Sequence, residues 1–137
     1  MGILGFLQRR QKYSSIQLYT EGNDKRLSAL VADTVIKRMI GLMYRERLNE
    51  GQCMLFLFRH NGIQGIWMRN MRFPIDIVWA DAKKRIVHVV EGAQPCKGLN
   101  CKTYYPKEPS MYVIEVAAGM ARTSGMVDGA RLVFECK

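Results

Sequence analysis

A mostly apolar stretch, residues 64–79, holds the polar side chains with the clearest potential for chemistry. It contains both tryptophans of the chain, with Trp67, Arg69 and Asn70 close together and Asp76 a few positions further on. A polar group inside an apolar strand either finds a partner within the protein or stays free for a ligand. We therefore predict that these four side chains form a polar cluster near a cleft.

The residue types in this cluster favour a small anionic ligand. The guanidinium fork of Arg69 suits a carboxylate or phosphate, and Trp67 offers an aromatic wall that would also accept a sugar-like molecule. Side chains alternate along a strand, so Trp67 and Arg69 are expected on one face. Asn70 then lies on the opposite face unless a bulge re-aims it. We expect Arg38 to reach the cluster from a neighbouring helix.

Asp76 and Glu115 are the two carboxylates within predicted strands, and they leave two other functions open. Either side chain has the apolar surroundings of a general base, so the protein could be an enzyme of the hydrolase type. Alternatively, each carboxylate is closed onto Arg38 or Arg69 as a buried ion pair. The protein would then be a structural or interaction module without a pocket. The sequence contains no dinucleotide or phosphate-loop fingerprint.

Four cysteines are present, and none of them form a Cys-x-x-Cys pair. Cys96 and Cys101 lie in a segment rich in proline and glycine, where a disulfide would close a short loop under oxidising conditions. Two free thiols in a reducing cytoplasm are the alternative. Cys53 and Cys136 fall in apolar runs and are expected to be buried. The cysteine spacing does not support a zinc site, and we expect no metal and no cofactor.

One change of hydrophobic period predicts a single helix over residues 34–44. Thr34 is suited to cap its N-terminus, and Gly41 marks either a close neighbour or the end of the helix. Apolar residues at helical spacing would pack this helix against a sheet. The expected contact residues are Ile36, Met39, Ile40 and Met43.

Short runs rich in alternating or β-branched residues predict seven or eight strands in the rest of the chain. The clearest are expected at residues 15–19, 26–31, 53–58, 86–90, 111–117 and 131–135. Two more apolar segments flank a break at Phe73-Pro74, and residues 59–62 and 91–110 are expected to be loops. This pattern predicts a mainly β fold, either a compact β-sandwich or a partly open barrel, with one short helix packed on it.

The chain of 137 residues fits one domain, which we expect over residues 15–137 after a flexible tail at 1–14. The formal net charge of +9 permits anionic partners. Because the basic residues are scattered, we do not expect nucleic acid among them. The apolar start, followed by arginines, allows at most a weak peripheral membrane contact through residues 1–12. We find no signal peptide or transmembrane helix and expect a cytoplasmic monomer.

Several motifs in a fixed order resemble one known family. They are Lys37-Arg-x-x-Gly-Leu-Met-x-Arg45, Met54-Leu-Phe56, Trp67-Met-Arg-Asn70, Pro74-Ile-Asp76 and Ile114-Glu-Val-x-Ala-Gly119. The sequence is similar to the family called domain of unknown function 192, from about residue 30 to the C-terminus. The resemblance implies a compact, mainly β fold of the jelly-roll-like type and brings no established activity. The chain departs from the family at Lys37, where a glutamate is usual, so half of a helix capping box is missing.

Overall fold

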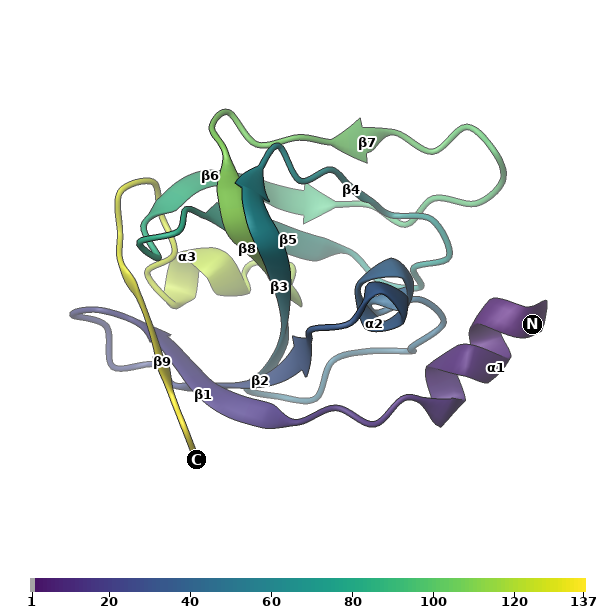
Figure 1. Cartoon of the computed structure of the whole chain (residues 1–137), viewed down its shortest axis with the longest axis horizontal. Helices are drawn as coiled ribbons and strands as arrows, with labels where there is room; N and C mark the ends of the chain where they lie inside the picture. Colours follow the sequence, from purple (N-terminus) through teal and green to yellow (C-terminus); the bar gives the residue numbers. More distant parts are fainter. Residues whose placement is uncertain (1) are drawn as a thin grey trace.

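The structure is a computed structural model that describes residues 2–137, and one strongly curled β-sheet is its main element (Figure 1). Seven strands lie in this sheet in the order β6-β5-β8-β3-β2-β1-β9, and β4 pairs with β7 in a separate two-stranded ribbon. The strands are β1 (Ser15–Thr20), β2 (Leu27–Ala32), β3 (Gln52–Gly62), β4 (Ile66–Trp67), β5 (Ile75–Ala80), β6 (Ile86–Ala93), β7 (Thr103–Tyr104), β8 (Ser110–Ala117) and β9 (Leu132–Glu135). The helices are α1 (Gly2–Arg10), α2 (Val35–Ile40) and α3 (Met120–Thr123). The predicted mainly β fold is confirmed, and the sheet is a half-barrel.

Hairpins and one crossover set the order of the strands. The β1–β2 and β5–β6 pairs are antiparallel neighbours joined by turns, as the turn residues between the apolar runs predict. Strands β2 and β3 are parallel, so the chain must cross over between them, and α2 lies in this crossover. Strand β8 is inserted between β3 and β5, which gives it a strand neighbour on both sides.

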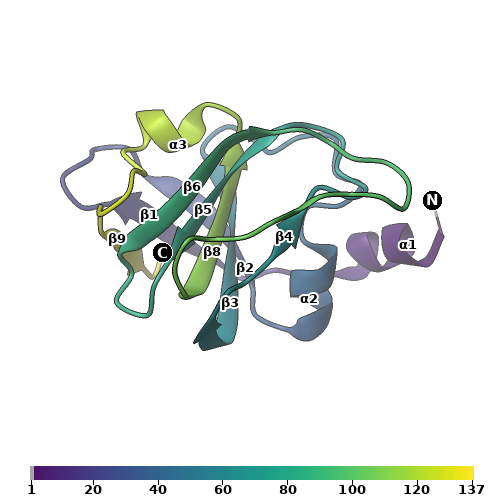
Figure 2. The same cartoon turned by 90° about the horizontal axis from the view of Figure 1, so that it is seen from above.

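The two faces of the sheet bury separate apolar clusters. One cluster includes Leu55 and Ile114 and contacts Ala121 of α3. The other includes Phe56 and Val113 and is covered by the chain segments that follow α2 and β4. Figure 2 shows α3 on one side of the curled sheet and α2 with the β4 ribbon on the other. This second face is the one on which the candidate site lies.

Helix α2 is shorter than predicted and packs through fewer residues. Thr34 caps it as expected, since its Oγ1 accepts a hydrogen bond of 3.1 Å from the backbone of Lys37. The helix ends at Ile40, because Gly41 has a φ of 50° and a ψ of −127°, which only glycine adopts easily. Ile40 and Met43 are buried as predicted.

Ile36 and Met39 are exposed, which corrects half of the predicted packing face of α2. Their exposure follows from the length of α2, which ends at Ile40 instead of near residue 44. Met43 is buried from the turn that follows α2 rather than from the helix itself, so one six-residue helix contacts the sheet mainly through its last turn. The periodicity of the apolar residues therefore indicated a helix correctly but overstated its contact with the core.

The N-terminal segment, predicted to be a flexible tail over residues 1–14, contains the helix α1 in the part that the structure describes. Its Gln8 is buried, and the Nε2 atom donates to the backbone oxygens of Gly41 at 2.9 Å and Met43 at 2.8 Å. Residue 1 lies outside the described residues. No helix within residues 2–137 is long and apolar enough to cross a membrane.

Two loops predicted from composition also differ in part from the structure. Residues 59–62 continue β3 as a strand, with an irregularity in its pairing to β8. Residues 91–110 begin with the end of β6 and contain the short strand β7, but otherwise form the expected long connection. Of the two cysteines expected to be buried, Cys53 is buried and Cys136 is exposed, because it lies beyond the last strand.

Candidate functional site: a pocket over Glu115

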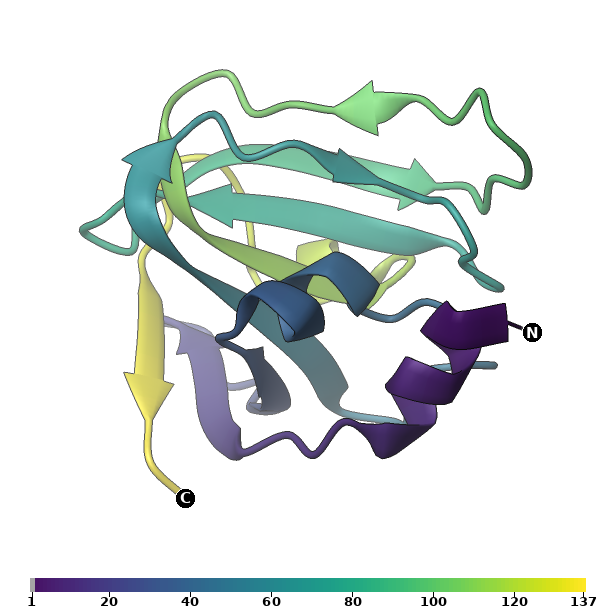
Figure 3. The ribbon, with the colours of Figure 1, turned by 45° about the vertical axis from the view of Figure 1, so that its right-hand side comes forward.

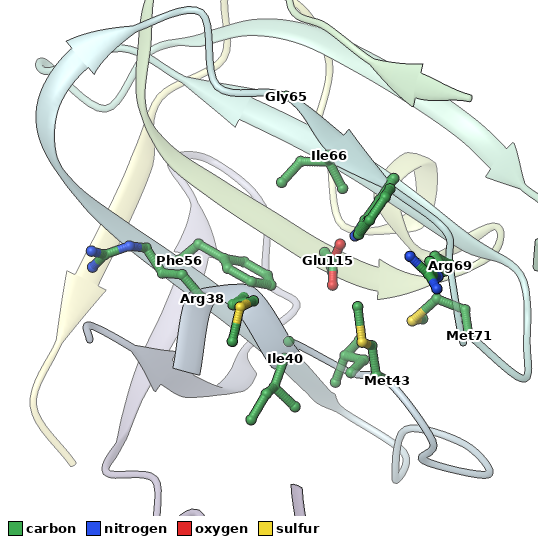
Figure 4. A pocket seen from close by; sticks show the side chains of 13 residues that line it. Arg38, Ile40, Met43, Phe56, Gly65, Ile66, Arg69, Met71 and Glu115 are labelled. Atoms are coloured by element: carbon green, nitrogen blue, oxygen red, sulfur yellow. The ribbon is translucent and has the colours of Figure 1, made fainter. Parts of the chain in front are cut away.

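A pocket of about 180 Å³ lies between the segment that follows α2 and the β4 ribbon, with the sheet as its floor. Its walls are largely apolar, and Figure 4 shows side chains from both sides converging on this space. The lining residues are Arg38, Met39, Ile40, Gly41, Leu42, Met43, Phe56, Gly65, Ile66, Trp67, Arg69, Met71 and Glu115.

Glu115 is the buried polar group of this pocket. It lies in β8, opposite Met54 of β3 and Ile77 of β5, so its neighbours across the sheet are apolar. Its exposed fraction is 4%, and within residues 2–137 its carboxyl group has no hydrogen bond or ion pair. Figure 4 shows the carboxyl group pointing into the space between Phe56 and Arg69.

The burial of Glu115 controls its charge. Removal from water raises the pKa of this carboxyl group from 4.5 to about 8, because burial penalises the ionised form. At neutral pH the side chain is therefore mostly an uncharged acid that can donate one hydrogen bond and accept others. A buried acid without a protein partner is costly, and such groups are concentrated at functional sites.

Trp67 and Arg69 both line the pocket, and their side chains contact each other at its rim. The guanidinium carbon of Arg69 lies 5.4 Å from the centre of the Trp67 ring, which is the geometry of a cation–π contact. Arg69 forms no salt bridge within the described residues, so its charge is balanced by no protein carboxylate.

Arg38 of α2 also lines the pocket, but its guanidinium group is partly engaged. Its Nη1 donates a hydrogen bond of 2.9 Å to the backbone oxygen of Leu57, and the group lies 5.5 Å from the Phe58 ring. Neither Arg38 nor Arg69 forms an ion pair with Asp76 or Glu115 within the part of the chain that the structure describes.

Asp76 is separate from the predicted cluster and has a different task. Its two carboxylate oxygens accept hydrogen bonds from the backbone N–H groups of Gly92 at 2.8 Å, Gly119 at 2.9 Å and Ala121 at 3.0 Å. The side chain is fully buried and does not line the pocket. Asp76 thus fixes the start of α3 and the bulged end of β6 to the centre of the sheet.

Asn70 lies behind the pocket wall rather than in its lining. Its φ of 62° is in the left-handed region that asparagine tolerates better than most residues. Its backbone oxygen accepts from Tyr44, and its Nδ2 lies 3.9 Å from the sulfur of Met43. Asn70 therefore joins the two chain segments that form opposite walls of the pocket.

A disulfide between Cys96 and Cys101 closes the loop that supports the β4 side of the pocket. The backbone of Cys96 exchanges two hydrogen bonds with the pocket wall: its N–H donates to Met68 at 3.0 Å and its oxygen accepts from Asn70 at 3.1 Å. The covalent loop thus braces the segment that carries Trp67 and Arg69. With its sulfur in this bond, Cys96 has no thiolate with which to act as a nucleophile.

The apolar lining of the pocket was missed by the sequence analysis. Phe56, Met43 and Met71 appear in the sequence as ordinary core residues, since nothing in an apolar side chain marks it as facing a cavity. Gly41 gave a usable signal, because a glycine inside a helical pattern indicates either a close neighbour or a helix end. Both occur here, since a Cβ atom at this position would lie 3.0 Å from the Phe56 ring.

A second hollow of about 440 Å³ lies at the β5–β6 turn but lacks the features of a built site. None of its lining side chains is buried: Asn61, Asp81, Ala82, Lys83, Arg85 and Arg131. Residues 2–137 contain no group of three or more His, Cys, Asp or Glu side chains placed to hold a metal ion.

The structure is a mainly β fold in which a curled sheet carries a buried acid, Glu115, beneath a surface cavity. Within residues 2–137 this acid has no hydrogen-bond or ion-pair partner. The chain belongs to the DUF192 family, described as "Uncharacterized ACR", whose family pattern matches residues 16–134. UPF0127 proteins of Thermococcus gammatolerans and Thermococcus kodakarensis are 31% and 28% identical over 99 residues, which is 72% of this chain. The matched regions span 61% and 59% of those two proteins.

Two crystal structures share the fold. A proposed transcription regulator of Sinorhizobium meliloti has a TM-score of 0.80 and 27% identity, and the match covers 90% of this chain and 96% of that protein. A protein of unknown function from Novosphingobium aromaticivorans has a TM-score of 0.77 and 24% identity, with 87% and 84% covered. Both crystal structures therefore have the same overall fold as this protein.

Proposed function

We propose that this protein binds a small organic anion in the pocket over Glu115. The observation that carries the proposal is the acid itself, since it is buried, without a protein partner and directed into the cavity. A ligand that hydrogen-bonds to Glu115 would satisfy the polar group that the fold leaves unpaired.

The lining indicates the chemistry of the ligand. Arg38 and Arg69 both line the pocket without a carboxylate partner within residues 2–137. Arg38 is partly engaged by the backbone oxygen of Leu57, so Arg69 is better suited to the charged end of a carboxylate or phosphate. Phe56, Met43 and Met71 suit a short apolar body, and the volume of about 180 Å³ limits the ligand to a small molecule. The scarcity of polar side chains in the walls makes a sugar-like ligand a poorer match than an amphiphilic acid.

The protonation state of Glu115 agrees with an anionic ligand. Below a pKa of about 8 the side chain is a neutral hydrogen-bond donor, and an anion can approach it without repulsion. As the pH rises through this value the carboxylate forms and opposes the anion. The affinity for an anionic ligand should therefore fall as the pH rises above about 8.

A thermal-shift panel tests the proposal, because a ligand that binds the folded state stabilises it by mass action. The panel contains benzoate, butyrate and phenyl phosphate, together with benzamide and butyramide as uncharged counterparts. We expect at least one anion to raise the melting temperature while its amide does not. Arg69→Ala should remove the shift.

Arg72→Ala is the matched control, because Arg72 is an exposed arginine on the same segment that does not line the pocket. The proposal is contradicted if no anion shifts the wild type, or if both arginine variants reduce the shift equally. In the second case the anions respond to general surface charge rather than to the pocket.

General acid catalysis is a second candidate function for the same pocket. A carboxyl group with a pKa raised to about 8 by burial can deliver a proton near neutral pH. Asp76 is not available for this role, because both of its oxygens are bonded to backbone N–H groups. If the pocket hydrolyses small alkyl esters, whose leaving alkoxide must take up a proton, Glu115→Gln should abolish turnover and retain binding. Equal turnover in the two proteins would exclude Glu115 as the acid.

A further inference from the structure

The neighbouring helices α1 and α2 both expose large apolar side chains to solvent. Ile3 of α1 is 68% exposed, Phe6 is 47% exposed and Val35 of α2 is 72% exposed. Ile36 and Met39 of α2 are exposed as well. Half of the ten large exposed apolar side chains in residues 2–137 therefore lie on these two short helices.

The two helices belong to one part of the surface. They contact each other, and the Gln8 side chain joins α1 to the backbone of Gly41 and Met43, just after α2. Figure 3 shows α1 and α2 coming forward on the same side of the molecule. In α1, Gly5 and Gln8 face the protein, whereas Ile3 and Phe6 point away from it. We call the exposed apolar residues of α1 and α2 the helical patch.

The charge around the helical patch is mainly positive. Residues 2–20 contain no aspartate or glutamate and include Arg10 and Lys12. Beside α2, the exposed Asp33 lies 3.8 Å from Lys37 in an ion pair, and Glu46 follows the segment after the helix. The guanidinium carbon of Arg10 lies 5.5 Å from the Phe6 ring, so a positive charge is placed beside an exposed apolar side chain. Apolar side chains flanked by arginine and lysine are typical of helices that lie in the interface of an anionic bilayer.

We propose that the helical patch docks this protein reversibly onto membranes that contain anionic lipids. Ile3 and Phe6 enter the boundary between headgroups and acyl chains, while Arg10 and Lys12 contact lipid phosphate and carboxylate groups. Because positive charge flanks the patch, the protein should bind an anionic bilayer more tightly than a neutral one. Because Met39 belongs both to the patch and to the pocket lining, docking brings one wall of the pocket to the lipid surface.

Cosedimentation of the full chain with lipid vesicles tests this inference. We expect binding to vesicles of phosphatidylcholine mixed with phosphatidylserine, and little binding to phosphatidylcholine alone. The double variant I3D/F6D should abolish binding, and R10A/K12A should weaken it about tenfold or more and reduce its salt dependence. These four side chains are exposed and lie outside the buried apolar clusters, and the contact between Arg10 and Phe6 is at the surface, so the melting temperatures should stay close to that of the wild type.

Leu99→Asp is the matched control, because Leu99 is 86% exposed and lies in the disulfide loop, outside the helical patch. It should bind vesicles as the wild type does. The inference is overturned if anionic vesicles do not bind the wild type, or if Leu99→Asp is as defective as I3D/F6D.

Other occupants of the patch give different outcomes. A dimer of the wild type that dissociates in I3D/F6D, without vesicle binding, would make the patch an interface between two copies. Binding to random-sequence duplex DNA without binding to vesicles would make the basic surface a nucleic-acid site. Each result would contradict the membrane proposal and leave the small-anion proposal untouched, because Arg69→Ala tests that pocket separately.

Discussion

Glu115 and Asp76 show how two buried carboxyl groups in neighbouring strands can have opposite roles. Asp76 accepts three backbone hydrogen bonds and is part of the framework, whereas Glu115 has no partner within residues 2–137. The sequence analysis selected both residues because each carboxylate interrupts an apolar strand. It could not separate them, because the backbone groups that satisfy Asp76 come from positions 16 to 45 residues further along the chain.

The raised pKa of Glu115 makes the stability of the protein depend on pH. In the unfolded chain the group ionises near 4.5, whereas burial raises the pKa of the folded group to about 8. Below the lower value both states are protonated, so the contribution of Glu115 to stability is fully present. Between the two values only the unfolded state loses its proton, and the contribution is lost as the pH rises to about 8.

We therefore predict that Glu115→Gln becomes stabilising relative to the wild type as the pH increases. The difference in the free energy of unfolding should grow by about 3–5 kcal/mol between the two pKa values, because the amide never ionises. Urea unfolding of both proteins across this pH range measures the effect. A difference that stays constant with pH would show that Glu115 is ionised normally in the folded protein.

Asp76→Asn should destabilise the protein strongly. The amide keeps one acceptor oxygen and presents an NH₂ group to buried backbone donors, so the expected cost is about 2–4 kcal/mol. Asp81→Asn is a suitable comparison, because Asp81 also accepts from the backbone N–H groups of Lys83 and Arg85 but is only half-buried. If the two variants lose the same stability, Asp76 does not hold the framework.

At the scale of the elements, the sequence predicted strands and hairpins better than helix contacts. The β1–β2 and β5–β6 hairpins follow from local turn chemistry, and each strand except the two-residue β7 occurs near its predicted place. The packing of α2 was wrong at Ile36 and Met39, because the helix ends one turn earlier than the apolar period suggests. Helix α1 was missed because a nine-residue segment with two glycines has little helical preference of its own.

Gly41 controls the end of α2 and the wall of the pocket. Gly41→Ala should lower the free energy of unfolding by about 2–3 kcal/mol, since the backbone conformation is unfavourable for alanine and the new Cβ meets the Phe56 ring at 3.0 Å. Gly129→Ala has a positive φ of 86° but no heavy atom within 4 Å, so it should lose only about 1 kcal/mol. Urea unfolding compares the two, and equal losses would mean that the contact with Phe56 is unimportant.

For the whole molecule, the pattern of short strand-like runs predicted a mainly β fold, and the curled seven-stranded sheet confirms it. Of the predicted site residues, the structure brings Arg38, Trp67, Arg69 and Glu115 to one pocket and places Asn70 and Asp76 outside its lining. The pocket could not be predicted as a shape, because it arises where a loop after α2 faces a two-stranded ribbon from distant parts of the chain. The sequence singled out its polar residues, together with Trp67 and Gly41, but not its other apolar lining residues.

The most direct test of small-anion binding over Glu115 follows the NMR signals of buried methionine methyl groups. Met43 and Met71 line the pocket, whereas Met126 is buried in the cluster on the other face of the sheet. Their methyl groups can be labelled with carbon-13 and followed by NMR during a titration with benzoate, at about pH 6 and about pH 9.5, on either side of the pKa of Glu115.

A small-anion pocket over a neutral Glu115 predicts saturable shifts of the Met43 and Met71 signals at the lower pH, with the Met126 signal unmoved. The affinity should fall at the higher pH in the wild type and stay the same in Glu115→Gln. Signals of Met43 and Met71 that do not move with benzoate, butyrate or phenyl phosphate, or that move only together with Met126, would contradict the account.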